Sequence, residues 1–274
     1  MEKNILIIGS TSELAQKTIE ELKKDSNDNN YRIFATSRHS ANLIDEKVTE
    51  FMLDVEHERD FIHLKEKFQN IEFDTIINFT GIAVAGAVVE LSELQLKKQF
   101  EVNLLGLLRI IKHFCPNLSE KGKLINVSSM ASYGTFPFIS PYCMSKASAD
   151  ILLNAYSIES NRKVVSIRPG AVATKFWESS IELNKTCLEE KSFKEEKEFL
   201  KENANKNSLH AKNPIYVAKK IASIIKKKNP KPVYNIGFDS KCAKLSRFLP
   251  QGLINFIIKK ALKIRLKNYG KQKQ

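Results

Sequence analysis

Residues 5–17 read ILIIGSTSELAQK: an apolar run that ends at Gly9, a short polar turn, and a segment with helical periodicity. A buried strand that leads through a turn into a helix has this pattern. Because backbone N–H groups at a helix N-terminus favour an anion, the turn is a candidate phosphate-binding loop. Its candidate cofactor-binding residues are Gly9, Ser10, Thr11, Ser12 and Leu14.

The same alternation continues along the chain. Apolar or β-branched runs predict seven strands, at 4–8, 31–36, 49–53, 73–78, 124–127, 164–167 and 233–236. Segments with helical periodicity separate them, at 12–24, 56–68, 94–114, 141–159 and 214–227. Strands that alternate with helices indicate βαβ units. We therefore expect an α/β fold: a single domain with a doubly wound parallel sheet and helices on both faces.

Two segments depart from this alternation. Residues 176–213 are a charged insertion, expected to be helical, that includes SFKEEKEFLKENANKNS and would cover the substrate site as a lid. Residues 241–274 carry ten basic and no acidic residues, so that +10 of the net charge of +13 belongs to them and +3 to residues 1–240. The expected organisation is a domain over 1–240 and a basic helical tail over 241–274.

Several classes of protein are disfavoured. The four cysteines lie far apart without a CxxC pair, and the five histidines form no HxH or HExxH group, which predicts reduced thiols and no metal site. The N-terminal apolar stretch is too short for a signal peptide. No run approaches the roughly 18 apolar residues of a spanning helix. These features predict a cytoplasmic protein.

Ligands of a doubly wound sheet bind beyond the carboxyl ends of its strands. Ser37 and Arg38 follow the second strand, where a carboxylate would hold the adenosine ribose of NAD; a guanidinium matches a phosphate instead, so this pair favours NADP(H) over NAD(H). Short polar or glycine-containing segments also follow the third, fourth and sixth predicted strands.

A Tyr-x-x-x-Lys spacing puts both side chains on one face of a helix. It occurs three times, at Tyr142, Tyr216 and Tyr269, but the first alone has a serine thirteen residues upstream. That serine, Ser129, directly follows a predicted strand. The group Ser129, Tyr142 and Lys146 is therefore the candidate catalytic site.

In order and spacing, these motifs resemble the short-chain dehydrogenase/reductase family over residues 5–174, which implies a sheet of the Rossmann type. The resemblance also implies further candidate cofactor-binding residues: Asp54, Val55, Asn78, Gly81, Tyr142, Lys146, Pro169, Gly170, Val172 and Thr174. The three glycines of the family's phosphate loop fall on Gly9, Glu13 and Ala15. Glu13 is a departure, because a carboxylate repels a pyrophosphate. The S-x-x-E spacing from Ser10 to Glu13 predicts a capping box that turns this carboxylate away from the loop.

The resemblance also implies catalytic roles. Tyr142 would exchange a proton with the substrate oxygen, and Ser129 would hold that oxygen. Lys146 would bind the nicotinamide ribose, and Asn103 would anchor a water that links Lys146 to solvent. A free phenol has a pKa of about 10. The neighbouring ammonium is expected to lower the pKa of Tyr142. The implied reaction is NADP(H)-dependent interconversion of a carbonyl and an alcohol.

The substrate is less defined. Tyr133, Phe136 and Trp177 suggest an apolar pocket and a hydrophobic carbonyl substrate, although such aromatic residues serve equally well as core. A keto-sugar or acyl-type ketoreductase of the same family, and a non-catalytic NADP(H)-binding protein, remain as alternatives. The intact set of Ser129, Tyr142 and Lys146 argues against the last.

The tail includes RFLPQGLINFIIKKALKIRLK at 247–267, a basic segment with apolar residues three or four apart. Such a helix is typical of contact with an anionic membrane surface, here through 248–267, but packing on the body or on a second subunit is equally open. No nucleic-acid-reading motif is present, so nucleic acid is not expected. The tail loosely resembles that of the membrane-associated hydroxysteroid and retinol dehydrogenase branch, and the family resemblance implies a homo-oligomer.

Overall fold

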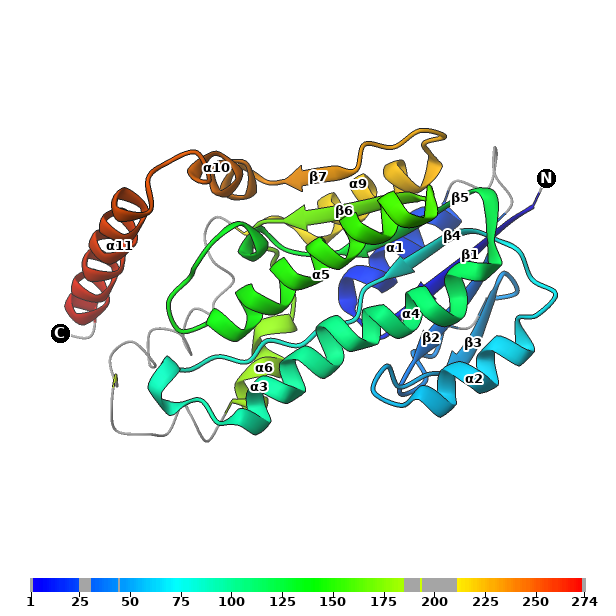
Figure 1. Cartoon of the computed structure of the whole chain (residues 1–274), viewed down its shortest axis with the longest axis horizontal. Coiled ribbons are helices and arrows are strands. Elements are labelled where there is room, and N and C mark those ends of the chain that lie inside the picture. The colour runs from blue at the N-terminus through cyan, green and yellow to red at the C-terminus, as the bar shows by residue number, and fades with distance from the viewer. Residues whose placement is uncertain (1, 25–30, 44, 185–192, 194–210, 273–274) are drawn as a thin grey trace.

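The computed structural model describes residues 2–24, 31–43, 45–184, 193 and 211–272. Seven strands form one sheet in the order β3-β2-β1-β4-β5-β6-β7, and every neighbouring pair is parallel (Figure 1). The strand order reverses between β1 and β4, which is the switch point of a doubly wound sheet. The expected α/β fold with helices on both faces is confirmed.

Six strands agree with the sequence prediction to within two residues at each end, because buried parallel strands are nearly continuous apolar runs. The strand predicted at 124–127 begins six residues earlier, at Leu118, because the mostly polar residues 119–123 are also part of it. Their bounds are β1 Lys3–Ile8, β2 Tyr31–Ser37, β3 Val48–Met52, β4 Phe73–Asn78, β5 Leu118–Val127, β6 Lys163–Pro169 and β7 Val233–Ile236. The described α-helices are α1 Glu13–Lys23, α2 Glu58–Lys67, α3 Glu93–Phe100, α4 Gly106–Phe114, α5 Ser140–Ser160, α6 Phe176–Leu183, α9 Pro214–Lys226, α10 Phe238–Ser246 and α11 Gln251–Gln272.

Alternate residues of the strands supply two cores. In β1, Ile5 and Ile7 join the core under α1 and α9, whereas Leu6 and Ile8 join the core under α2, α4 and α5. Figure 1 shows α4 and α5 in front of the sheet. The second core contains a group of phenylalanines in which Phe34 and Phe73 meet edge to face at 5.5 Å between ring centroids. Helices thus cover both faces of the sheet, and a ligand-binding site is expected at the carboxyl edge of the sheet.

The predicted helix at 94–114 is interrupted. A π-helical turn over Glu101–Leu105 separates α3 from α4. Short 3-10 turns occur at Val88–Glu90 (η1), Cys115–Asn117 (η3) and Met130–Tyr133 (η4). The π turn carries Asn103, one of the candidate catalytic residues, and π turns inside helices are frequent at functional sites.

The segment after β7 contains two helices instead of the one expected from Pro250 onward. The first of them, α10, packs on η4 and β7, and the second, α11, extends away from the body (Figure 1). Of the insertion at 176–213, the structure describes 176–184, Phe193 and 211–213; the rest of the lid prediction lies outside the described residues. None of the helices, as far as they are described, has the length and apolar character to cross a bilayer.

Candidate active site

The loop after β1 is built to let its backbone come close to another group. Gly9 has a φ of +84°, which disfavours any side chain, and a Cβ there would lie 3.0 Å from the backbone nitrogen of Thr80. Ser10 is fully buried and its hydroxyl donates to Ser37 Oγ at 3.2 Å. Ser10 therefore ties the loop to the end of β2, and the backbone of the loop, not this side chain, faces the sheet edge.

The helix α1 begins with unpaired donors. Ser12 is its N-cap, and its Oγ accepts the Ala15 N–H at 3.2 Å. The N–H groups of Glu13 and Leu14 have no acceptor within the described part of the chain, as expected for the first turn of a helix. This turn suits an anion.

The prediction of a capping box from Ser10 to Glu13 is wrong. The helix starts two residues later than that pattern requires, which puts Glu13 at the first helical position. Its carboxylate instead accepts the backbone N–H of Lys175 at 3.3 Å, across the crevice between the loops that follow β1 and β6. Glu13 is thus directed to the neighbouring loop rather than back to its own helix.

The residues at the end of β2 and those in the loop after β3 make different contacts. Ser37 is buried and donates to the His39 carbonyl at 2.5 Å, whereas Arg38 is exposed and makes no side-chain contact that the described residues record. Asp54 Oδ1 accepts the Glu56 N–H at 3.1 Å, and Val55 packs against Gly106. Arg38 is therefore available to a ligand, while Asp54 also fixes its own turn.

Asn78 and Gly81 lie in the middle of this edge. Asn78 Nδ2 donates to Asn126 at 2.8 Å, and its Oδ1 accepts from both the N–H and the hydroxyl of Thr80. A Cβ at Gly81 would lie 3.3 Å from Lys146 Nζ and 3.5 Å from Asn103 Oδ1. The absence of a side chain at Gly81 therefore lets the backbone of this loop lie close to the buried Lys146 ammonium.

The structure brings Ser129, Tyr142 and Lys146 together. Ser129 follows β5 and is the N-cap of η4, while Tyr142 and Lys146 lie one turn apart on α5. The Lys146 ammonium donates to the Val127 carbonyl at 3.1 Å and lies 5.7 Å from the centre of the Tyr142 ring. Burial lowers the pKa of Lys146 to about 8, although the Asp150 carboxylate opposes this effect.

The expected lowering of the Tyr142 pKa is not found. Burial raises the pKa of Tyr142 to about 12, and a hydrogen bond with Ser129 opposes the rise without cancelling it. The cause is the aromatic cover: the rings of Phe176 and Trp177 lie 5.8 Å and 5.6 Å from that of Tyr142. In such surroundings a phenolate is poorly solvated, so Tyr142 stays protonated at neutral pH.

Asn103 is held by its side chain. Its Oδ1 accepts the Ile82 N–H at 2.9 Å, and its Nδ2 donates to the Ile82 carbonyl at 3.0 Å and to Ser145 Oγ at 3.0 Å. The neighbouring Gln99, fully buried, also donates to the Ile82 carbonyl and to Ser145. Gln99 and Ser145 were missed by the sequence analysis; both lie on the inner face of a predicted helix one turn from a candidate residue.

The candidate substrate residues divide into two groups. Phe136 and Trp177 pack in the cluster around Tyr142, beside the catalytic group. Tyr133 is held elsewhere: its hydroxyl donates to Asn235 at 2.8 Å, and the Arg168 guanidinium lies 4.4 Å from its ring centre. These contacts make Tyr133 a link between η4 and the strands β6 and β7.

The loop after β6, with Pro169, Gly170, Val172 and Thr174, is positioned by a residue that the sequence analysis missed. Asp239 Oδ2 accepts the Ala171 N–H at 2.6 Å, and a Cβ at Gly170 would overlap the Asp239 carboxylate. The helix α10 therefore supports this loop. A carboxylate shortly after the last strand, just beyond the positive-φ Gly237, is the sequence signal that could have drawn attention to it.

Observations of this chain fit a dinucleotide. The first turn of α1 offers the N–H groups of Glu13 and Leu14, whereas those of Gly9 and Ser10 donate to the Thr36 carbonyl. The Lys146 ammonium has one recorded hydrogen-bond acceptor, Val127, among the described residues, so it can donate to further groups. The exposed Arg38 stands at the end of β2, one strand away from that loop. The His, Cys, Asp and Glu residues that the structure describes form no group suited to a metal ion.

Fold and site together define an α/β protein with a doubly wound parallel sheet and a Ser-Tyr-Lys group beyond the carboxyl edge of that sheet. The family model described as short chain dehydrogenase matches residues 3–184. The chain therefore belongs to the short-chain dehydrogenase family, a family of oxidoreductases.

Individual relatives agree with this assignment. The chain is 30% identical over 232 residues to a probable short-chain type dehydrogenase/reductase, VdlC, of Helicobacter pylori, covering 77% of this chain and 81% of the relative. It is 26% identical over 258 residues to 3-amino-tetrahydro-pyrrolizinone reductase of Xenorhabdus hominickii, covering 87% and 88%. A short chain dehydrogenase from Burkholderia cenocepacia in complex with NADP has a similar fold, with a TM-score of 0.72, 15% identity, and coverage of 94% of this chain and 97% of that one.

Proposed function

We propose that the protein is an NADP(H)-dependent oxidoreductase that interconverts a carbonyl and a primary or secondary alcohol, with Tyr142 as the general acid and base. The observation that carries the proposal is the buried contact group of Ser129, Tyr142 and Lys146 beside Gly81. A purely structural role gives no reason to bury a lysine whose one recorded hydrogen-bond acceptor is the Val127 carbonyl, beside a glycine that is close enough to crowd it.

The residues have distinct tasks in this proposal. The bound cofactor supplies or accepts the hydride. Tyr142 donates its phenolic proton to the substrate oxygen as negative charge develops there, and the Ser129 hydroxyl aligns that oxygen. Lys146 holds the ribose hydroxyls of the cofactor and places a positive charge next to the phenolate that Tyr142 becomes. Asn103 is hydrogen-bonded to Ile82 and so holds the π turn against the loop that carries Gly81, next to Lys146.

The protonation state of Tyr142 fits its proposed role as a proton donor. Burial raises the pKa of Tyr142 to about 12, so the phenol carries its proton at neutral pH. In the reverse reaction, oxidation of an alcohol, the phenolate would accept the proton, and the positive charge of Lys146 would favour that form. The same group therefore serves both directions.

Arg38 supports NADP(H) over NAD(H). Its guanidinium is exposed at the end of β2 next to the buried Ser37, and a 2′-phosphate would meet a bidentate donor there. The rings of Phe136, Phe176 and Trp177 around Tyr142 support a hydrophobic carbonyl substrate.

A homo-oligomer is part of the proposal. The exposed apolar side chains Leu108 on α4 and Ile151 and Ile158 on α5 support it, because they lie on the helices that cover one face of the sheet. Contact of residues 248–267 with a membrane is a separate proposal, since the chemistry at Tyr142 does not depend on it.

The test is a fluorescence titration of the purified protein with NADPH and NADH, followed by a panel of aldehydes and ketones. We expect Arg38→Ala to weaken NADPH binding and leave NADH binding unchanged, with the exposed Arg59→Ala as the matched control. Tyr142→Phe should lower kcat by roughly 10²–10⁴ while NADPH still binds. Equal binding of both nucleotides by wild type and Arg38→Ala would remove the NADP(H) assignment.

A further inference from the structure

The segment after β7 exposes large apolar side chains. Six of them, on α10, on α11 and on the connection between these helices, form what we call the tail surface: Phe238, Leu245, Phe248, Leu253, Phe256 and Ile257. Phe248 and Phe256 are 80% and 62% exposed. Single exposed apolar residues are ordinary, but three phenylalanines on a short segment amount to a patch that suits a partner.

The charge of the same segment has one sign. All ten charged residues from Lys241 to the C-terminus are basic. The ion pairs recorded among the described residues all lie between Lys17 and Arg168, so they neutralise none of the described basic residues of α10 and α11. The acidic residue nearest in sequence, Asp239, is turned inward onto Ala171. The tail surface therefore combines apolar rings with unneutralised positive charge.

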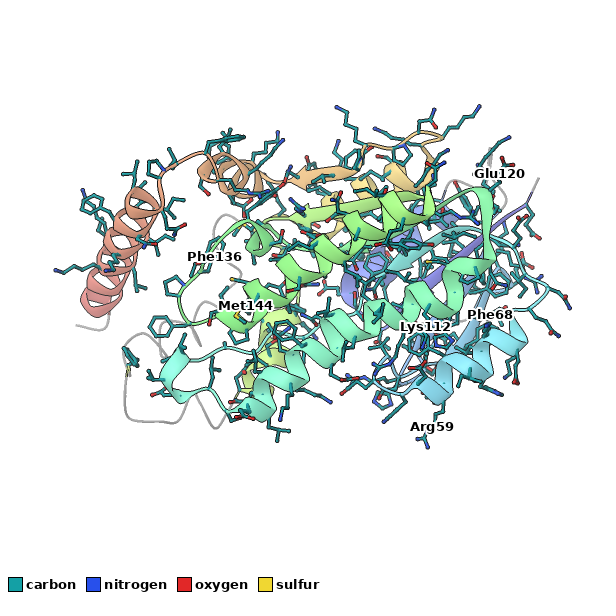
Figure 2. All side chains as sticks on the ribbon, viewed as in Figure 1. Arg59, Phe68, Lys112, Glu120, Phe136 and Met144 are labelled. Atoms are coloured by element: carbon teal, nitrogen blue, oxygen red, sulfur yellow. The ribbon has the colours of Figure 1, made fainter. Side chains whose placement is uncertain are left out.

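The tail surface lies at the active-site end of the molecule. In Figure 1 the heads of β6 and β7 point toward the end where α11 lies, and the segment before α3 reaches the same end. Figure 2 shows Phe136 toward this end and Glu120 at the opposite one. The carboxyl edge of the sheet, with Tyr142 beyond it, thus opens toward the side that carries α11.

A second apolar feature lies at this end. Val88, Val89 and Leu94 in and after η1 are 71%, 84% and 76% exposed. Ala87, Val88 and Val89 line a groove of about 300 Å³ together with Pro137, Phe138 and Phe193. The Gly86 N–H donates to the Phe138 carbonyl at 2.8 Å, which joins this groove to the loop that leads into the catalytic helix α5.

We propose that the tail surface docks the protein on an anionic lipid bilayer, with the η1 groove facing the lipid, so that the substrate enters from the membrane. The docking part of this proposal depends only on the tail surface. The entry of a hydrophobic carbonyl substrate from the membrane rests on the proposed function. Basic side chains attract anionic headgroups, and the phenylalanines bury their rings at the boundary of the acyl chains.

Charge complementarity favours a bilayer over the other occupants. A second copy of this chain would bring the same positive charge against the tail surface, which costs free energy. Nucleic acid would satisfy the lysines but leave Phe238, Phe248 and Phe256 in water. An anionic bilayer satisfies both components of the surface.

Docking is tested by sedimentation of the full-length protein with vesicles of phosphatidylcholine alone and of phosphatidylcholine with phosphatidylglycerol in equal parts. We expect binding to the anionic vesicles that weakens with salt. The triple change Lys259→Glu, Lys260→Glu and Lys263→Glu should weaken it roughly 100-fold. Phe248→Ser with Phe256→Ser should also weaken it. The matched control reverses the charge of three exposed lysines at the opposite end of the molecule, Lys65, Lys67 and Lys121. This control should bind the vesicles as the wild type does.

The orientation is tested with an environment-sensitive fluorophore on single cysteines, in a background of Cys187→Ser and Cys242→Ser. Labels at Val89→Cys and Phe256→Cys should shift to the blue on anionic vesicles, and a label at Glu120→Cys should not. A shift at position 256 alone would overturn entry from the membrane. No vesicle binding, tighter binding to a short DNA duplex, or a tail variant that changes the oligomeric state in light scattering would overturn docking itself.

These outcomes are separable from the proposed function. NADPH binding and reduction of a water-soluble carbonyl are measured without vesicles, and the tail variants should retain both. Loss of vesicle binding with intact catalysis removes the docking proposal alone. Absence of catalysis with intact vesicle binding removes the proposed function and leaves docking in place.

Discussion

The Asn103 side chain forms two hydrogen bonds with the backbone of one residue, Ile82: its Oδ1 accepts the Ile82 N–H at 2.9 Å, and its Nδ2 donates to the Ile82 carbonyl at 3.0 Å. The amide side chain thus pairs with the backbone of Ile82 as a neighbouring strand would. This pairing holds the loop after β4, including Gly81, against the π turn at Glu101–Leu105. The position of the backbone next to the Lys146 ammonium is fixed from outside the catalytic helix.

Replacement of Asn103 should therefore affect stability and catalysis together. Asn103→Leu leaves the Ile82 N–H without its acceptor, while the Ile82 carbonyl keeps Gln99 as a donor. One buried donor left unpaired costs about 1–3 kcal/mol. We expect a lower free energy of unfolding in urea and a kcat at least about tenfold lower in the protein that remains folded.

The matched control for this change is Asn117→Leu. Asn117 Nδ2 also donates to two backbone carbonyls, those of Phe68 and Ile71, but at the far end of the sheet. The control should lose stability and keep kcat. Equal retention of kcat in both variants would mean that Asn103 is a structural amide without influence on the site.

The pH dependence of activity should report on Lys146. Its ammonium, with a pKa of about 8, is protonated below that pH, and its charge is lost as the pH rises through 8. If the charged form supports catalysis, kcat/KM falls on the alkaline side with an apparent pKa near 8. Asp150 raises the pKa of Lys146, so Asp150→Asn should move this limb to lower pH.

The control for Asp150→Asn is Ser166→Ala. Ser166 Oγ donates to Asp150 Oδ1 at 2.6 Å, so this change removes a hydrogen bond and keeps the charge. The alkaline limb should stay where it is. Asp150→Asn is also expected to destabilise the fold, because Asp150 lies 2.8 Å from Arg168 in a buried ion pair. If the alkaline limb of the pH profile does not move in Asp150→Asn, a group other than Lys146 controls that limb.

Much of the fold was predictable from local patterns. The bounds of β4 and β7 were predicted to the residue, because polar or turn residues flank each buried apolar run. The grouping of Ser129, Tyr142 and Lys146 followed from spacing on a helix and from the position of a strand end. In both cases the information lies within some fifteen residues.

The features that were not predicted depend on contacts between distant segments. The π turn falls in a run of continuous helical periodicity, and what accompanies it is the pairing of Asn103 with Ile82, 21 residues away. Glu13 was assigned to a local cap, but its partner Lys175 lies 162 residues away. The raised pKa of Tyr142 depends on the cover by Phe176 and Trp177, which periodicity does not reveal.

Stability should rise with pH just above neutrality because of two buried lysines. Burial lowers the pKa values of Lys123 and Lys146 to about 8, against 10.5 for the free side chain. Between pH 8 and about 9 the folded state therefore binds fewer protons than the unfolded state. The free energy of unfolding then increases with pH, by at most about 1.4 kcal/mol per unit for each lysine.

Above this window the buried thiols and phenols act in the opposite direction. Cys115, Cys143, Tyr142 and Tyr156 have raised pKa values, so the folded state keeps protons that the unfolded state releases. A maximum near pH 9 is expected in urea titrations. Lys123→Met should flatten the rise below it, with the exposed Lys121→Met as the control. A steady decrease of stability from pH 8 would contradict the assignment.

Asp239 should act as a positioning residue for the loop after β6. Its carboxylate accepts the Ala171 N–H at 2.6 Å and occupies the space where a side chain at Gly170 would lie. Because a charge-assisted hydrogen bond contributes about 1.5–3 kcal/mol, Asp239→Ala should raise the KM for NADPH roughly tenfold or more. Steady-state kinetics with NADPH as the varied substrate measures this.

A loss of packing alone would give a different result. Asp239→Asn keeps an acceptor for the Ala171 N–H and should restore most of the affinity, whereas Cys242→Ser, an exposed change on the same helix α10, should have no effect. Gly170→Ala forces a methyl group against the carboxylate and should resemble Asp239→Ala in its KM. If Asp239→Ala lowers the melting temperature but leaves the KM for NADPH unchanged, Asp239 supports α10 and does not position the loop.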